Sequence, residues 1–96
     1  MPEAPLANGK GAAMRLAKHV KFREEKFGGV LFETRSEKVY TLNATATAVV
    51  REIQAGADEA TIRARIGDRF ADAEGAIERD VGTLIADLRQ KGLIED

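Results

Sequence analysis

The sequence contains no cysteine, no tryptophan and a single histidine among its 96 residues. Without cysteine the chain can form neither a disulfide framework nor a thiolate metal site, and one histidine cannot build a histidine-rich site. No apolar run approaches the ~20 residues that a membrane-spanning helix needs, and the first residues lack the continuous apolar segment of a signal peptide. These absences favour a cytoplasmic protein that does not enter a membrane.

Catalytic motifs are missing as well. The sequence has no GxxxxGK[ST], GxGxxG, HExxH or GxSxG pattern. Its adjacent carboxylates, such as Glu24 and Glu25, do not converge on a substrate, because consecutive residues point in different directions in helices and in strands. The composition, which is 44% hydrophobic and 32% charged, is that of one small globular domain. We therefore predict a protein that is not an enzyme and that needs no cofactor.

The chain begins with a segment that lacks any long amphipathic pattern. Residues 1–17 mix Pro, Gly and Ala, which predicts a flexible N-terminal arm. The folded domain is expected to span residues 18–96. It opens with Val20 and Phe22 alternating with charged residues, a pattern typical of a half-buried strand.

The next segment predicts a hairpin. Gly28 and Gly29 are expected to break the chain before a strand over Val30–Thr34, and a further strand covers Lys38–Leu42. An even-numbered loop between these strands pairs Phe32 with Val39, Leu31 with Tyr40, and Glu33 with Lys38. Such a register matches apolar with apolar side chains and places opposite charges together. Arg35-Ser36 is a poor two-residue turn, so a four-residue loop is expected.

Three helices follow. Asn43 is a good N-cap for the first, which ends at Gly56. Asp58 begins a short second helix, which Gly67 is able to end early. Asp72 is expected to cap the third. The apolar positions of the first and third helices recur at helical spacing: Ala46, Val49, Val50 and Ile53, then Ile77, Val81, Leu84, Ile85 and Leu88.

The predicted fold class is α+β, with a three-stranded antiparallel sheet followed by three helices. The three-helix part resembles a winged-helix element. Leu93 and Ile94 are expected to return to the core as a short extended tail after Gly92. In such a fold Lys38–Leu42 has a free edge, which offers N–H and C=O groups to an extended peptide. A third helix lying beside it would supply the apolar floor of a groove.

Three blocks of sequence, in this order and at these separations, resemble the PqqD-like peptide chaperones. The blocks are "VYTLN" before an alanine-rich helix, "ADEATIRARI" after a glycine, and "ERDVGTLIADLRQKGLIE" at the end. The resemblance covers about residues 20–95. It implies the recognition domain that serves ribosomally made, post-translationally modified peptides. Such a domain binds the leader of a precursor peptide as an added strand and presents it to a modifying enzyme, often a radical S-adenosylmethionine enzyme.

The resemblance also implies which residues bind the peptide. On the docking strand they are Lys38, Val39, Tyr40, Thr41 and Leu42, and on the facing helix they are Ile77, Asp80, Val81 and Leu84. The glycines of "KFGGVLFET" depart from the pyrroloquinoline quinone members, which suggests a different peptide. The expected partners are therefore a leader peptide and a peptide-modifying enzyme.

Two other functions stay open at this point. A winged-helix DNA-binding regulator shares much of the topology, and Arg63, Arg65 and Arg69 would lie on one helix. The net charge of -1 argues against nucleic-acid binding. A small dimerisation module is the other alternative, because Lys38–Leu42 would pair equally well with its own copy.

Overall fold

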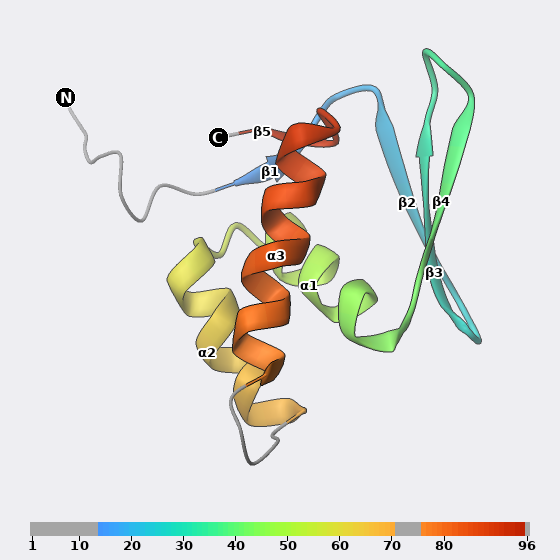
Figure 1. Cartoon of the computed structure of the whole chain (residues 1–96). Coiled ribbons are helices and arrows are strands. Elements are labelled where there is room, and N and C mark those ends of the chain that lie inside the picture. The colour runs from blue at the N-terminus through green and yellow to red at the C-terminus, as the bar shows by residue number, and fades with distance from the viewer. Residues whose placement is uncertain (1–13, 71–75, 96) are drawn as a thin grey trace, which may run out of the picture.

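The structure is a computed structural model that describes residues 14–70 and 76–95. Five strands and three helices follow one another within these ranges (Figure 1). The strands are β1 (Arg15–Leu16), β2 (Val20–Glu25), β3 (Gly28–Glu33), β4 (Lys38–Leu42) and β5 (Ile94–Glu95). The helices are α1 (Ala44–Gln54), α2 (Glu59–Arg69) and α3 (Ala76–Gln90). The predicted α+β fold, with a three-stranded antiparallel sheet before three helices, is confirmed.

The hairpin of β3 and β4 has the predicted register. Glu33 lies opposite Lys38, Phe32 opposite Val39, and Leu31 opposite Tyr40. The predicted four-residue loop between the two strands is also present, with Glu37 in the left-handed region at a φ of 63°. Apolar cross-strand pairs and the Glu33–Lys38 charge pair therefore set a register that the local sequence already specifies.

Gly28 and Gly29 lie inside β3, so the expected break in the chain before Val30 is wrong. Both glycines pair with β2, and Gly29 also pairs with Leu42. A Cβ on Gly28 would lie 2.2 Å from the Leu42 carbonyl oxygen, and one on Gly29 would lie 2.9 Å from the Thr47 hydroxyl. The glycines thus allow α1 and the chain that enters it to approach the sheet closely.

The core lies between the sheet and the helices. Leu31 from β3, Val49 and Val50 from α1, and Ile85 from α3 are all fully buried. Asn43 and Asp58 cap α1 and α2 as predicted, each accepting a hydrogen bond of 2.8 Å from a backbone N–H. These two bonds satisfy N–H groups that the first helical turn leaves unpaired.

The ends of α2 and α3 agree with the predicted ends in some respects and not in others. Gly67 does not end α2, which continues to Arg69. Asp72, the expected cap of α3, lies outside the described residues. Gly92 follows α3 with a φ of 75°, as expected of a residue just after a helix. Leu93 and Ile94 return to the core and are buried.

The N-terminal boundary of the folded part also differs from the prediction. β1 pairs with β5 in a second, two-stranded sheet, and the Ala17 N–H donates to the Leu93 carbonyl at 2.9 Å. Met14 and Ala17 are buried, with 2% and 5% of their surface exposed. Residues 14–17 therefore belong to the folded part, whereas residues 1–13 of the predicted arm lie outside the described residues.

Replacement of Met14 by alanine tests this boundary. Because Met14 is buried, Met14→Ala is expected to lower the free energy of unfolding by about 2–5 kcal/mol in urea denaturation. Arg15→Ala is the control: the Arg15 side chain is 69% exposed and pairs with Glu95 at 3.2 Å, an ion pair worth ~0–1 kcal/mol. Equal stability of the two variants would show that residue 14 does not contribute to the core.

Candidate functional site

β4 is an edge strand whose second side is unpaired. Among the described strands it pairs only with β3. The Thr34 N–H donates to the His19 carbonyl at 2.9 Å, which continues the β2–β3 ladder by one pair. Main-chain groups alternate in direction along an antiparallel strand. The N–H and C=O groups of Phe32 and Val30 therefore point toward β2, while those of Leu31 and Glu33 point toward β4.

The same alternation fixes the direction of the main-chain groups of β4. Tyr40 and Lys38, the partners of Leu31 and Glu33, use their N–H and C=O groups within the sheet. The N–H and C=O groups of Val39 and Thr41 therefore point outward, at the free edge. Such groups are a template for one more strand.

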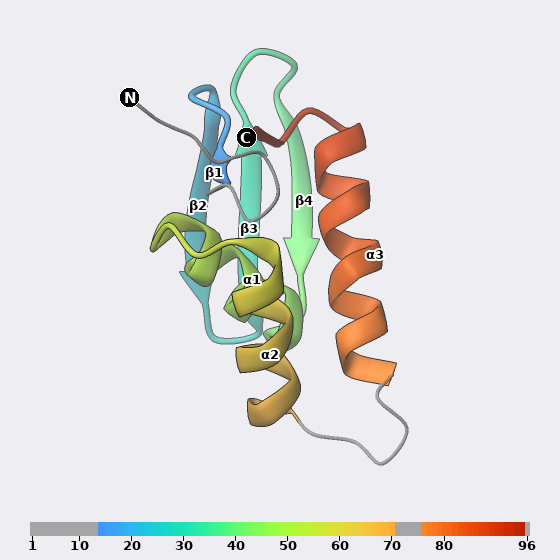
Figure 2. The same cartoon turned by 90° about the vertical axis from the view of Figure 1, so that its left-hand side faces the viewer.

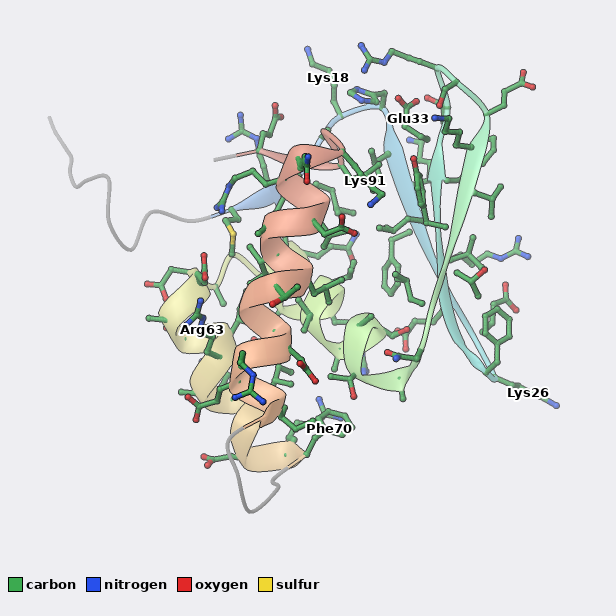
Figure 3. The ribbon with its side chains drawn as sticks, viewed as in Figure 1. Lys18, Lys26, Glu33, Arg63, Phe70 and Lys91 are labelled. Atoms are coloured by element: carbon green, nitrogen blue, oxygen red, sulfur yellow. The ribbon has the colours of Figure 1, made fainter. Side chains whose placement is uncertain are left out.

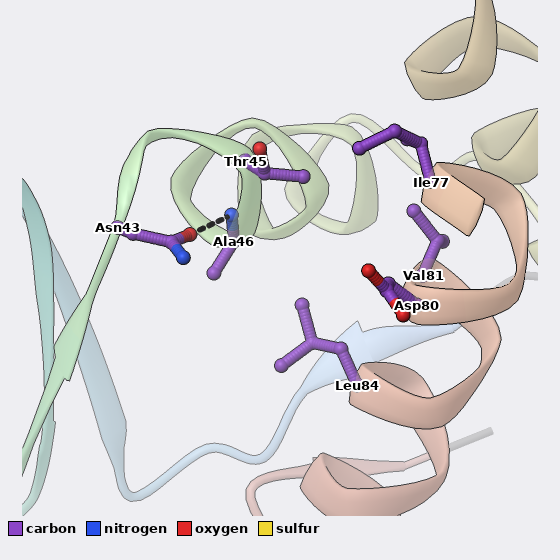
Figure 4. A pocket seen from close by; sticks show the side chains of 7 residues that line it. All are labelled: Asn43, Thr45, Ala46, Ile77, Asp80, Val81 and Leu84. Carbon is purple, nitrogen blue, oxygen red and sulfur yellow. Dashed lines mark hydrogen bonds between the residues drawn. The ribbon is translucent and has the colours of Figure 1, made fainter. Parts of the chain in front are cut away.

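A groove lies beside this edge, between α1 and α3. α3 runs in the opposite direction to β4 (Figure 2), and Figure 1 shows that it lies apart from the sheet, on the side where α1 and α2 pack. The groove has a volume of ≈ 360 Å³. Its wall from α3 consists of Ile77, Asp80, Val81 and Leu84, and the opposite wall consists of Asn43, Thr45 and Ala46 at the start of α1 (Figure 4).

The predicted helix residues therefore lie together in one groove, at different depths. Ile77 and Leu84 are half-buried, and Asp80 is exposed. Val81 is only 1% exposed, so its side chain belongs chiefly to the core and forms the floor of the groove. This graded exposure follows from the helical spacing, which turns one side of α3 to the core and the adjoining side to the groove.

The predicted strand residues divide between two faces. Tyr40 is half-buried and packs against the core, and Leu42 is buried with 5% exposure. Val39 is 60% exposed, and Lys38 and Thr41 are exposed too. At the free edge, β4 thus exposes the main-chain N–H and C=O groups of Val39 and Thr41, while the Leu42 side chain contributes to the core. The peptide-binding role of these residues stays a prediction.

The wall at the start of α1 was not predicted. Asn43 was identified as an N-cap and Ala46 as a core-facing residue, but neither was assigned to a site. The signal that would have identified them is their position, since they directly follow the edge strand. A chain that turns from β4 into α1 must place the first helical turn at the end of the free edge.

Glu33 holds the loop that connects β3 to β4. Its Oε1 accepts hydrogen bonds from the Arg35 N–H at 2.6 Å and the Ser36 N–H at 3.2 Å. Desolvation alone would raise the pKa of the Glu33 carboxyl, but these hydrogen bonds and the nearby His19 and Arg35 together hold the pKa below its usual range. The carboxylate is therefore ionised at neutral pH and keeps the loop, and with it the start of β4, in place.

The described residues form neither a metal site nor a membrane-spanning helix. Within 14–70 and 76–95, no three His, Asp or Glu side chains gather where they would hold a metal ion. No helix in the same ranges combines the length and apolar character needed to cross a bilayer. The groove thus brings together the four predicted residues of α3, whereas none of the predicted strand residues, 38–42, lines it.

Comparison with known proteins gives a consistent result. Residues 28–94 match the family described as "Coenzyme PQQ synthesis protein D (PqqD)". A solved structure, "Lasso peptide synthetase B1 complexed with the leader peptide", is 26% identical with a TM-score of 0.74, covering 88% of this chain and 100% of that one. A search of the curated proteins returned no match.

A further solved structure supports the fold. It is described as "TbiB1 in Complex with the TbiA(beta) Leader Peptide", with a TM-score of 0.75 and 18% identity, over 84% of this chain and 94% of that one. At this identity the similarity concerns the fold alone. The family match extends over most of the chain and includes β3, β4 and all three helices. The chain therefore belongs to the PqqD family, as its sequence blocks predicted.

Proposed function

We propose that this protein binds the leader of a ribosomally made precursor peptide and presents it to a peptide-modifying enzyme. The leader adds to the outer side of β4 as one more strand. Its main chain bonds to the outward groups of Val39 and Thr41, and alternate side chains enter the groove against Ile77 and Leu84. Main-chain bonds then supply affinity, and the groove supplies selectivity.

The juxtaposition of an unpaired edge with an apolar groove carries this proposal. A peptide strand added to β4 would lie on the side of that strand toward α3, which runs in the opposite direction (Figure 2). The ≈ 360 Å³ groove sits at the end where β4 passes into α1. The lasso peptide synthetase B1 relative, solved with a leader peptide, provides a further argument.

The protein acts as a carrier and not as a catalyst in this proposal. Its sequence has no nucleophile paired with a base and no phosphate-binding loop. The enzyme that receives the leader is, on the family resemblance, a radical S-adenosylmethionine enzyme or another peptide-modifying enzyme. We place the encounter in the cytoplasm, whose reducing conditions suit a chain without cysteine.

The two alternatives have less support. Two of the three arginines of α2 that suggested DNA binding are engaged by carboxylates: Arg63 pairs with Glu59 at 2.8 Å and Arg65 with Glu52 at 2.7 Å. The third, Arg69, lies over the Phe70 ring. Such pairing reduces the positive potential available to phosphates. A dimer through β4 would use the same edge as the leader, so the two would compete for it.

A proline on the edge tests strand addition. Val39→Pro removes an outward N–H while leaving the bonds to β3 intact, and proline is tolerated on sheet edges. Loss of one hydrogen bond, about 0.5–1.5 kcal/mol, should weaken leader binding by roughly 2- to 13-fold in isothermal titration. The probe is a synthetic copy of the leader of a precursor peptide, taken from a short open reading frame beside the gene where one is found.

The matched control is a proline on the other edge of the sheet. By the same alternation, the Glu24 N–H of β2 points away from β3. Glu24→Pro should therefore leave leader affinity unchanged. If folded Val39→Pro binds the leader as tightly as the parent, the leader does not add to β4.

Shortening a groove residue tests the second half of the proposal. Leu84 lines the groove and is half-buried, so Leu84→Ala removes apolar surface that a leader side chain would cover. The expected loss is about 1–2 kcal/mol of binding free energy, or roughly 5- to 30-fold in Kd. Thr83→Ala, at an exposed position of the same helix, should bind as the parent does. Equal affinity for all three proteins would place the leader outside the groove.

A further inference from the structure

The outer face of the sheet, opposite the helices, carries apolar side chains that neither the core nor the groove uses. Two rows cross all three strands on this face: Lys21, Phe32 and Val39 in one, and Arg23, Val30 and Thr41 in the other. Residues directly opposite each other in a ladder share a face. We call these six residues the outer patch.

The outer patch is accessible. Phe32 is 37% exposed and Val39 is 60% exposed, although each is large and apolar. A second cavity of ≈ 300 Å³ lies on this face, lined by Lys21, Arg23, Val30 and Phe32. That volume is at the lower limit of ligand sites, which suits one or two side chains of a partner. Exposed apolar side chains with a polar border are typical of protein interaction sites.

The charge of the outer patch is positive. Lys21 forms no ion pair with any residue that the structure describes, and the Arg23 side chain is 83% exposed. The ladder places one carboxylate on this face, Glu25, which pairs with Arg23. Lys26 lies in the turn between β2 and β3 and extends from that end of the sheet (Figure 3). A partner that approaches this face meets cations around an apolar centre.

The outer patch also reaches the free edge of the sheet. Val39 and Thr41 contribute side chains to the patch and their outward main-chain groups to the edge of β4. A partner seated on the patch would therefore lie next to any strand added to β4. A patch and an edge that share residues allow a carrier to hold two proteins at once.

We propose that the outer patch is a second docking surface, which binds an acidic segment of a partner protein through an apolar anchor residue. The anchor enters the cavity between Val30 and Phe32. Carboxylates on either side of the anchor pair with Lys21 and Arg23. This surface is separate from the groove between α1 and α3, so its occupation does not require a bound leader.

Titration of the ¹⁵N-labelled full chain with two synthetic peptides tests this proposal. Both peptides carry a central Phe-Leu pair, flanked by glutamates in one and by lysines in the other. The glutamate peptide is expected to shift the amide signals of Lys21, Val30 and Phe32, and to bind on the order of 10-fold more tightly than the lysine peptide. Lys21→Glu should weaken glutamate-peptide binding by a similar factor.

Lys18→Glu is the matched control, because it makes the same charge change on the connection between β1 and β2, away from the patch (Figure 3). It should bind the glutamate peptide as the parent does. Phe32→Thr, which keeps a side chain suited to a strand, should abolish the shifts in a folded protein.

Several results would overturn the proposal. Equal binding of the two peptides would remove the charge argument. Shifts confined to the residues of the groove would place the acidic segment there. A dimer in sedimentation that Phe32→Thr dissociates would show that a second copy of the chain occupies the patch. Each result is separate from the leader-binding test, since Val39→Pro and Leu84→Ala are measured with a different peptide.

Discussion

The outward N–H groups of Val39 and Thr41 have no hydrogen-bond acceptor among the residues that the structure describes. Because main-chain groups alternate along β4, every second residue of this strand faces the free edge. An exposed edge is a liability in a small protein, since it pairs with any available strand. In the proposed function the groove between α1 and α3 makes pairing at this edge selective, because its apolar side chains favour particular residues of an added strand.

The groove depends on two close approaches. Gly28 and Gly29 let the start of α1 lie against the sheet, since a Cβ on either would collide with backbone or side-chain atoms. The Leu93 carbonyl accepts a hydrogen bond from Ala17, which ties the chain after α3 to β1. Together these contacts fix α1 and the far end of α3 relative to the sheet. The groove is therefore formed by packed elements and not by loops.

Local features of the fold could be predicted from the sequence, and distant ones could not. The β3–β4 register follows from neighbouring residues, because Glu33 and Lys38 pair only if Phe32 meets Val39. The glycines were interpreted as a break because their low strand propensity was visible, whereas the chain that approaches them was not. β1 was missed because two residues carry no periodic pattern and their partners lie about 80 positions away.

In the candidate site, too, local features could be predicted from the sequence and distant ones could not. Helical spacing brought Ile77, Asp80, Val81 and Leu84 to one side of α3, as expected. The sequence did not specify which β4 residues face the free edge, since that depends on the hydrogen bond between Thr34 and His19. Burial likewise separated Val81, at 1% exposure, from its neighbours in the groove. Depth and main-chain direction are properties of the assembled sheet and helices.

Amide hydrogen exchange at β4, with and without the leader peptide, tests the central claim most directly. In the free protein the Tyr40 amide is expected to exchange slowly, because it bonds within the sheet, while the Val39 and Thr41 amides exchange fast. Leader binding should slow Val39 and Thr41 and leave Tyr40 nearly unchanged. Binding of the leader with Val39 and Thr41 still exchanging fast would contradict strand addition at this edge.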